Sequence, residues 1–202
     1  YIFSALIFVG IISLSTCRPE IQFPKELEVQ EQINILLNYP DLPPKQQFNA
    51  TAYYRDVWYV ISSFNPERPS HKSEDNTTCI KFTSQILENG NTSLFYTQSY
   101  KDMPDSHVEL IINLTEFQNG VGKFIAQLQP VDKDGNAIDS YYPVRTTIID
   151  TDYSNYSVEY RCIQILDEAL CYYFILSRKP YVLDPNVEPI LNKLELKLQD
   201  FT

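Results

Sequence analysis

Short runs of β-branched and aromatic residues, separated by turn residues, fill the chain from Arg55 to Lys179. Runs of this kind are typical of β-strands, and the Gly, Pro, Asn and Asp clusters between them mark reverse turns. Several of the turns, such as Glu88–Asn91 and Lys133–Asn136, are compatible with hairpins. Eight strands are predicted, at Asp56–Phe64, Thr78–Leu87, Ser93–Tyr100, His107–Leu114, Gly122–Gln129, Val144–Tyr153, Ser157–Ile165 and Leu170–Arg178. The pattern indicates an all-β meander of sequential antiparallel strands.

Eight sequential antiparallel strands can close into an up-and-down β-barrel, whose interior is just wide enough for one small ligand. An open sandwich is the alternative, but it needs crossover connections, and the loops here are short. After Pro185 the apolar residues follow helical spacing, which predicts one α-helix of about fourteen residues packed outside the barrel. Its apolar stripe consists of Val187, Ile190, Leu191, Leu194 and Leu198.

The first residues predict export. An apolar run, Tyr1–Ile12, ends in small polar residues before Arg18, which is typical of a secretory signal with its cleavage site. The run is shorter than the roughly 20 apolar residues of a membrane span, so stable membrane insertion is not expected. We expect a signal peptide at 1–16, truncated at its start, and one secreted, extracellular domain at 17–202. Within it, 17–54 form an N-terminal arm, 55–179 the barrel and 185–200 the helix. A short helix around Lys25–Leu37 is one interpretation of the arm.

Five Asn-X-Ser/Thr sequons support export as glycosylation sites, at Asn49, Asn76, Asn91, Asn113 and Asn155. A glycosylated Asn113 must face solvent, so strand alternation directs Val108, Leu110 and Ile112 inward. Alternation gives an apolar interior with a few polar groups, the expected lining of a small-molecule site. The predicted lining is Val60, Ile80, Phe82, Ile86, Tyr96, Leu110, Ile112, Phe124, Ala126, Leu128, Thr146, Tyr172 and Phe174.

Composition argues against several other classes of protein. A net charge of −10 and a pI near 4.6 disfavour a nucleic-acid partner. The only candidate catalytic thiol, Cys79, is better used in a disulfide, so no catalytic residues and no enzyme activity are expected. The loop Asp132–Asn136 and the pair Asp150/Asp152 suggest solvated turns, because the later Glu of a calcium loop is missing. No metal site is predicted.

Haem is disfavoured, because a haem-binding barrel would need an inward axial histidine. His71 lies in a polar loop, and alternation places His107 on the outer face, next to the inward Val108. We therefore expect no required cofactor.

Three segments resemble the lipocalin family: Asp56–Val60 with its Trp58, Thr151–Tyr156, and Arg178 at the end of the last strand. The chain is similar over roughly residues 48–200 to divergent secreted arthropod lipocalins of the insect apolipoprotein D and bilin-binding type. Asp56 stands where the family usually has Gly. The resemblance implies a calyx with a plugged closed end, where Arg178 stacks on Trp58 by a cation–π contact. It assigns structural roles there to Thr151, Asp152 and Tyr153 as well.

Four cysteines, Cys17, Cys79, Cys162 and Cys171, allow two disulfides in three connectivities. The resemblance implies Cys17–Cys162 and Cys79–Cys171. The alternative is a Cys162–Cys171 bridge in the last hairpin, which requires a turn centred on Leu166 and Asp167.

The resemblance and the predicted lining together indicate extracellular binding, and transport or sequestration, of a small hydrophobic molecule such as a lipid, retinoid, carotenoid or bilin. The inward aromatic residues would suit a flat conjugated ligand. One alternative is a secreted interaction or inhibitor protein that acts through its outer surface or loops. Another is a small-amine scavenger, which would need inward carboxylates. The oligomeric state is left open.

Overall fold

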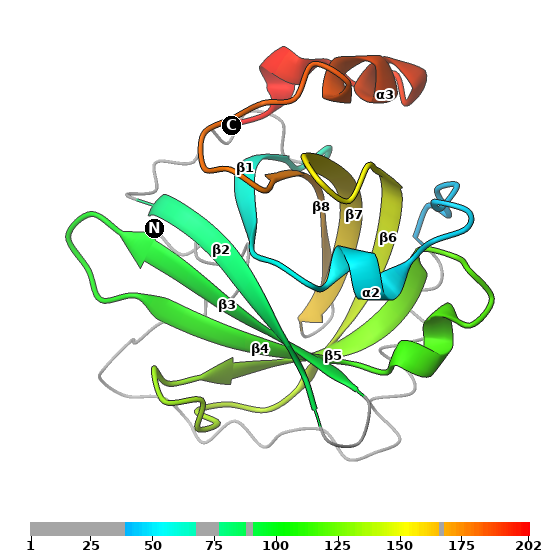
Figure 1. The fold of residues 1–202 in the computed structure, drawn as a ribbon. Helices are drawn as coiled ribbons and strands as arrows, with labels where there is room; N and C mark the ends of the chain where they lie inside the picture. The colour runs from blue at the N-terminus through cyan, green and yellow to red at the C-terminus, as the bar shows by residue number, and fades with distance from the viewer. Residues whose placement is uncertain (1–38, 68–76, 88–90, 166–167) are drawn as a thin grey trace.

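The computed structural model describes residues 39–67, 77–87, 91–165 and 168–202, and in them eight strands form one closed antiparallel barrel (Figure 1). Each strand pairs with the next, and β1 pairs with β8. The strands are β1 (Trp58–Phe64), β2 (Thr77–Ile86), β3 (Thr92–Tyr100), β4 (Ser106–Ile112), β5 (Lys123–Val131), β6 (Tyr142–Thr151), β7 (Tyr156–Ile165) and β8 (Glu168–Ser177). The predicted up-and-down barrel is confirmed. The signal at 1–16, the helix at 25–37, Cys17, His71 and Asn76 lie outside the described residues.

The meander gives the barrel two different ends. The β2–β3, β4–β5 and β6–β7 connections lie at the same end as the segment that precedes β1, and the other four connections lie at the opposite end. The first end carries two short helices, α2 (Ala50–Tyr53) and η2 (Leu114–Phe117), on the same side of the barrel in Figure 1. We call it the closed end, and the other the open end.

Aromatic side chains fill the closed half of the barrel. Tyr53 from α2 lies 5.2 Å from the Trp58 ring, centroid to centroid, and Phe117 from η2 lies 5.2 Å from Phe124. Trp58 is fully buried and its indole Nε1 donates to the Tyr53 carbonyl. Aromatic side chains thus occupy the half of the core next to the helices.

The C-terminal helix is shorter than the predicted fourteen residues. It appears as α3 (Val187–Lys193), followed by a separate turn η3 (Leu198–Asp200). The helix ends because Glu195 adopts a positive φ of 59°, and the Leu196 N–H bonds back to the Leu191 carbonyl, as in a Schellman cap. The chain then returns to β1, where Thr202 exchanges backbone hydrogen bonds with Ser63.

The position of α3 outside the barrel is as predicted. Val187, Ile190 and Leu191 pack on the outward residues Val158 and Ile175 of β7 and β8. No helix in the described ranges is long and apolar enough to cross a membrane.

The disulfide joins Cys162 to Cys171, so the expected Cys17–Cys162 and Cys79–Cys171 pairs are wrong. β7 ends at Ile165 and β8 begins at Glu168, which places the two cysteines directly opposite each other, with 4.1 Å between their Cα atoms. Both cysteines are buried on the outer face of the barrel, with Tyr39 and Leu42 of the arm packed nearby. Among the described cysteines, Cys79 is a free thiol.

Candidate ligand-binding site

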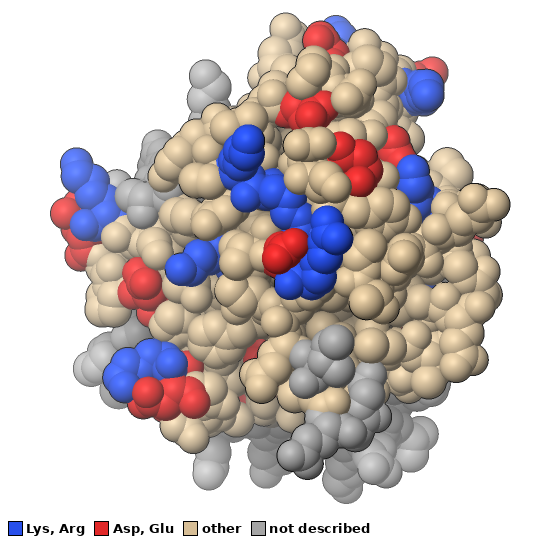
Figure 2. Space-filling view, viewed as in Figure 1, with Lys and Arg blue, Asp and Glu red and all other residues tan. Residues whose placement is uncertain are grey.

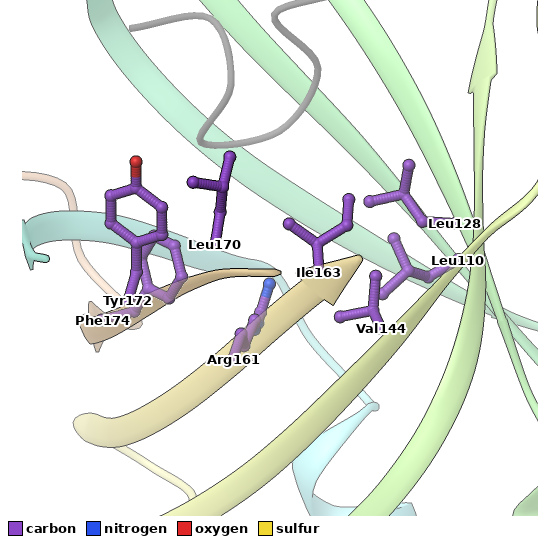
Figure 3. Close-up of a pocket in the computed structure, with 8 residues that line it drawn as sticks. All are labelled: Leu110, Leu128, Val144, Arg161, Ile163, Leu170, Tyr172 and Phe174. Carbon is purple, nitrogen blue, oxygen red and sulfur yellow. The ribbon is translucent and has the colours of Figure 1, made fainter. Parts of the chain in front are cut away.

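A pocket that is partly open to solvent lies in the open half of the barrel, and its volume of about 310 Å³ includes the solvent space at its mouth. Figure 3 shows the side chains that enclose it, which come from β4 to β8. They are Leu110, Leu128, Val144, Arg161, Ile163, Leu170, Tyr172 and Phe174.

Four of the predicted lining residues, Leu110, Leu128, Tyr172 and Phe174, line this pocket. Most of the others point inward and are buried in the core instead: Ile80, Phe82, Tyr96, Ile112, Phe124, Ala126 and Thr146. Val60 is half-buried against the same core, and the side chain of Ile86 is outside the described set. Strand alternation thus predicts which residues point into the barrel, but not where along the barrel axis a cavity lies. That position depends on the aromatic side chains that fill the closed half.

Sequence reasoning missed Val144, Ile163, Leu170 and Arg161. Leu170 stands two positions before Tyr172 and Val144 two before Thr146, so alternation itself could have identified them. Arg161 lies opposite Tyr172 in the β7–β8 register and shares its inward face. An arginine was not expected inside because charged side chains are rarely buried unless paired.

Arg161 is held in place by Glu159 on the same strand. Its Nε donates to Glu159 Oε2 over 2.6 Å, and its Nη2 also contacts that oxygen. The side chains are 8% and 1% exposed, and the Tyr53 hydroxyl donates to Glu159 from α2. Burial disfavours the guanidinium charge, but the attraction of Glu159 outweighs it and holds the pKa of Arg161 above its ordinary value. Arg161 is therefore a permanent cation.

Three aromatic rings surround this cation. The guanidinium carbon lies 5.7 Å from the centre of the Phe82 ring, 5.2 Å from Tyr96 and 5.3 Å from Phe174. These distances are within the range of cation–π attraction, which is stronger in a desolvated site. Aromatic rings and one guanidinium group therefore form the inner end of the pocket.

At the closed end, Arg178 stacks on Trp58 with 3.6 Å between its guanidinium carbon and the ring centre. Its nitrogens donate to five backbone carbonyls. One of these belongs to Tyr153 and another to Asp56, which does not adopt a positive φ, so the family's glycine is not required there.

The turn before β7 is organised by Thr151 and Asp152. The Thr151 hydroxyl donates to the Tyr156 carbonyl, and Asp152 Oδ1 accepts from the backbone N–H groups of Ser154, Asn155 and Tyr156. These contacts hold Tyr153 at its positive φ of 65°, with its carbonyl toward Arg178.

The sequence profile of the Nitrophorin family matches residues 41–202, which is most of the chain. The chain belongs to the nitrophorin family. It is therefore a divergent arthropod lipocalin and a ligand-binding protein of the lipocalin type.

Among curated relatives of this nitrophorin-family chain, Triafestin-1 from Triatoma infestans is 25% identical over 181 residues, covering 81% of each protein. Among solved structures, the amine-binding protein of Rhodnius prolixus, determined as a tryptamine complex, is similar with a TM-score of 0.70 at 24% identity, covering 81% of this chain and 84% of that one. Insecticyanin from Manduca sexta is similar with a TM-score of 0.58 at 19% identity, covering 81% and 83%. These structures share the fold.

Nitrophorin-family members bind haem, but the described residues of this chain do not fit it. Haem iron needs an axial ligand directed into the cavity. His107 lies outside the barrel, where its ring stacks on Phe95 at 5.3 Å. In the parts of the chain that the structure describes, no three His, Cys, Asp or Glu side chains form a metal site.

Proposed function

We propose that this protein is secreted and sequesters a small, mainly apolar ligand with an anionic or neutral polar group in the open half of its barrel. The observation that carries the proposal is the composition of the pocket: of its eight lining residues, seven are apolar or aromatic and the eighth is Arg161. Removing an apolar ligand body from water would supply most of the binding free energy, at about 25 cal/mol per Å² buried. Arg161 would orient the polar group.

The charge of the pocket argues against a small-amine ligand. The Rhodnius prolixus protein was determined with tryptamine, an amine, so its fold accepts such ligands. Here the inward carboxylate, Glu159, is already bound to Arg161 and to the Tyr53 hydroxyl, and the charged side chain that lines the pocket is a cation. An ammonium group would meet a like charge at low dielectric, whereas a carboxylate would meet an opposite one.

Three ten-carbon probes that differ only in the head group test this proposal: decanoate, decanol and decylamine, each titrated calorimetrically. We expect decanoate to bind at micromolar to submillimolar Kd, decanol more weakly, and decylamine at least tenfold more weakly than decanoate. Arg161→Gln should remove the preference for decanoate. Arg145→Gln is the matched control, because Arg145 is also buried but lies on the outer face, where it donates to the carbonyls of Tyr39 and Pro40. The proposal fails if none of the probes binds, and the charge argument fails if decylamine binds best.

A second candidate function is interaction with another protein through the open-end loops. Large apolar side chains are exposed there, with Met103 in the β3–β4 connection 56% exposed and Ile138 in the β5–β6 connection 67% exposed. The face shown in Figure 2 carries acidic and basic side chains in small mixed groups, with wide uncharged areas between them. Loss of all probe binding in a correctly folded protein would favour this function over carriage.

A further inference from the structure

The four sequons that the structure describes all lie at the closed end of the barrel. Asn49 precedes α2, Asn91 lies in the β2–β3 connection, Asn113 between β4 and η2, and Asn155 in the β6–β7 connection. These are the connections that the meander gathers at one end, although successive members are 22 to 42 positions apart in the chain. Their grouping is a property of the fold and is not apparent from their spacing.

Asn49 and Asn113 have the same local geometry. Both side chains are exposed, and each caps a short helix with its Oδ1: Asn49 accepts from the Ala52 N–H at 3.0 Å, and Asn113 from the Thr115 N–H at 3.0 Å. The Thr115 hydroxyl, which belongs to the same sequon, also donates to Asn113 Oδ1 at 2.7 Å. In each cap the bonds are made by Oδ1, whereas a glycan is attached through Nδ2.

The other two sites are less open. Asn155 is exposed, but its Nδ2 donates to Asp152 Oδ2 at 2.6 Å, and Asn91 is half-buried, with its carbonyl accepting from the Leu87 N–H. All four nevertheless surround one surface. The backbone N–H of Asn49 donates to the Tyr153 hydroxyl. The Asn155 carbonyl accepts from the backbone N–H of Arg178, whose side chain donates to the Tyr153 carbonyl.

We propose that the closed end of this barrel is an N-glycosylated face, with Asn49 and Asn113 as its principal attachment sites and Asn155 and Asn91 less fully occupied. The donor is an oligosaccharide linked to a polyisoprenyl diphosphate. The Nδ2 atom forms a bond to the anomeric carbon and loses one proton to a base of the transferase. The bond between that carbon and the diphosphate oxygen breaks, and the lipid diphosphate leaves with the electron pair.

This arrangement separates the glycans from the pocket. The aromatic core of the closed half lies between the glycosylated face and the pocket. The residues that line the pocket on β5 to β8 lie toward the open ends of these strands. Bulky hydrated sugars at the closed end would exclude close approach of another macromolecule there. They would leave the open end accessible.

The test is site-resolved mass spectrometry of the full chain, expressed behind a secretion signal in insect cells. Enzymatic deglycosylation in ¹⁸O-water converts each occupied Asn to ¹⁸O-labelled Asp. We expect labelling above 80% at Asn49 and Asn113 and lower labelling at Asn155 and Asn91. Thr51→Ala and Thr115→Ala should each remove one glycan from the intact mass, whereas the matched variants Thr51→Ser and Thr115→Ser keep the sequon and should keep the glycan.

Recovery of unlabelled Asn49 and Asn113 from the secreted wild-type protein would overturn the proposal, and this readout does not depend on how any variant folds. The separation from the pocket is tested by titrating decanoate before and after native deglycosylation. We expect the Kd to change less than twofold. A change of fivefold or more would place the sugars at the pocket mouth and overturn the separation, and a protein that binds no decanoate would still report site occupancy.

Discussion

Arg161 and Glu159 lie two positions apart on β7, and both side chains point into the barrel, where the Arg161 Nε meets Glu159 Oε2 at 2.6 Å. Two charges have been removed from water here, a costly arrangement that is compensated only while both partners remain. Glu159 also accepts from the Tyr53 hydroxyl, so the pair connects α2 at the closed end with the pocket.

Glu159→Gln should destabilise the protein by about 3–5 kcal/mol, because it leaves the Arg161 charge buried without its counter-charge. The double variant Glu159→Gln/Arg161→Met removes both charges and should recover a large part of this loss. Urea unfolding followed by far-UV circular dichroism measures both. Equal destabilisation of the single and the double variant would show that the ion pair does not determine the effect.

Arg178→Lys should cost about 2–3 kcal/mol in unfolding free energy. The planar guanidinium stacks on Trp58 and donates to five carbonyls. A lysine ammonium group is not planar and cannot reproduce this set of hydrogen bonds. Arg55→Lys is the control, since Arg55 is exposed and pairs only with the exposed Asp56 among its described ion-pair partners. It should change stability by less than about 0.5 kcal/mol. Chemical denaturation compares the two, and similar effects would contradict the structural role of Arg178.

Replacing both Cys162 and Cys171 by Ala should lower the unfolding free energy by about 2–3 kcal/mol, as expected for a disulfide closing a loop with a sequence separation of 9. The native bridge should also resist dithiothreitol until the protein unfolds, because both cysteines are buried. Cys79→Ala, which removes a half-buried free thiol, should cost less than about 1 kcal/mol. A non-reducing peptide map that lacks the Cys162–Cys171 pair would contradict this connectivity.

Asp152→Ala should destabilise the protein at neutral pH by about 1–2 kcal/mol, because three backbone N–H groups and the Asn155 side chain lose their acceptor. Burial alone would raise the pKa of Asp152, but these hydrogen bonds outweigh it and hold the pKa below its usual value. Because the folded-state pKa is depressed, the stabilisation is present above the unfolded pKa of about 4 and is lost as the pH falls through the folded value.

The pH dependence of Asp152 is measured by comparing the wild type with Asp152→Ala in urea at pH 7, 5, 4 and 3. The difference between them should be constant from pH 7 to 5 and shrink below about pH 4. A difference that grows on acidification would show that the carboxylate is not the stabilising form.

Glu195→Gly should stabilise the protein by about 0.5–1 kcal/mol. Glu195 caps α3 with a φ of 59°, a left-handed conformation that costs an L-residue about 1 kcal/mol and glycine almost nothing. Lys193→Gly, within the same helix, should instead destabilise it by about 1 kcal/mol. Thermal unfolding distinguishes the two, and a loss of stability in Glu195→Gly would contradict the cap.

The number of strands, their antiparallel order and the face of each strand that points inward could be predicted from the sequence. These features are local, since alternation and turn residues are encoded within a few positions, and an eight-strand meander closes in few ways. Inward residues such as Leu110, Phe124 and Phe174 followed from this periodicity.

Which inward residues border the pocket and which are buried in the core depends on tertiary packing and could not be predicted from the sequence. Phe124 shares the inward face of Leu128, but Phe117 from η2 packs against it with 5.2 Å between the ring centres, and no local sequence pattern predicts that packing. The burial of Arg161 was also unpredictable, because it depends on Glu159 and Tyr53 as partners, and Tyr53 lies more than 100 residues away. The pairing of Cys162 with Cys171 followed from the register of β7 and β8, which places the two residues opposite each other. The periodicity of a strand depends on neighbouring residues. The volume of the pocket, the register of paired strands and the pairing of buried charges depend on contacts between residues far apart in the sequence.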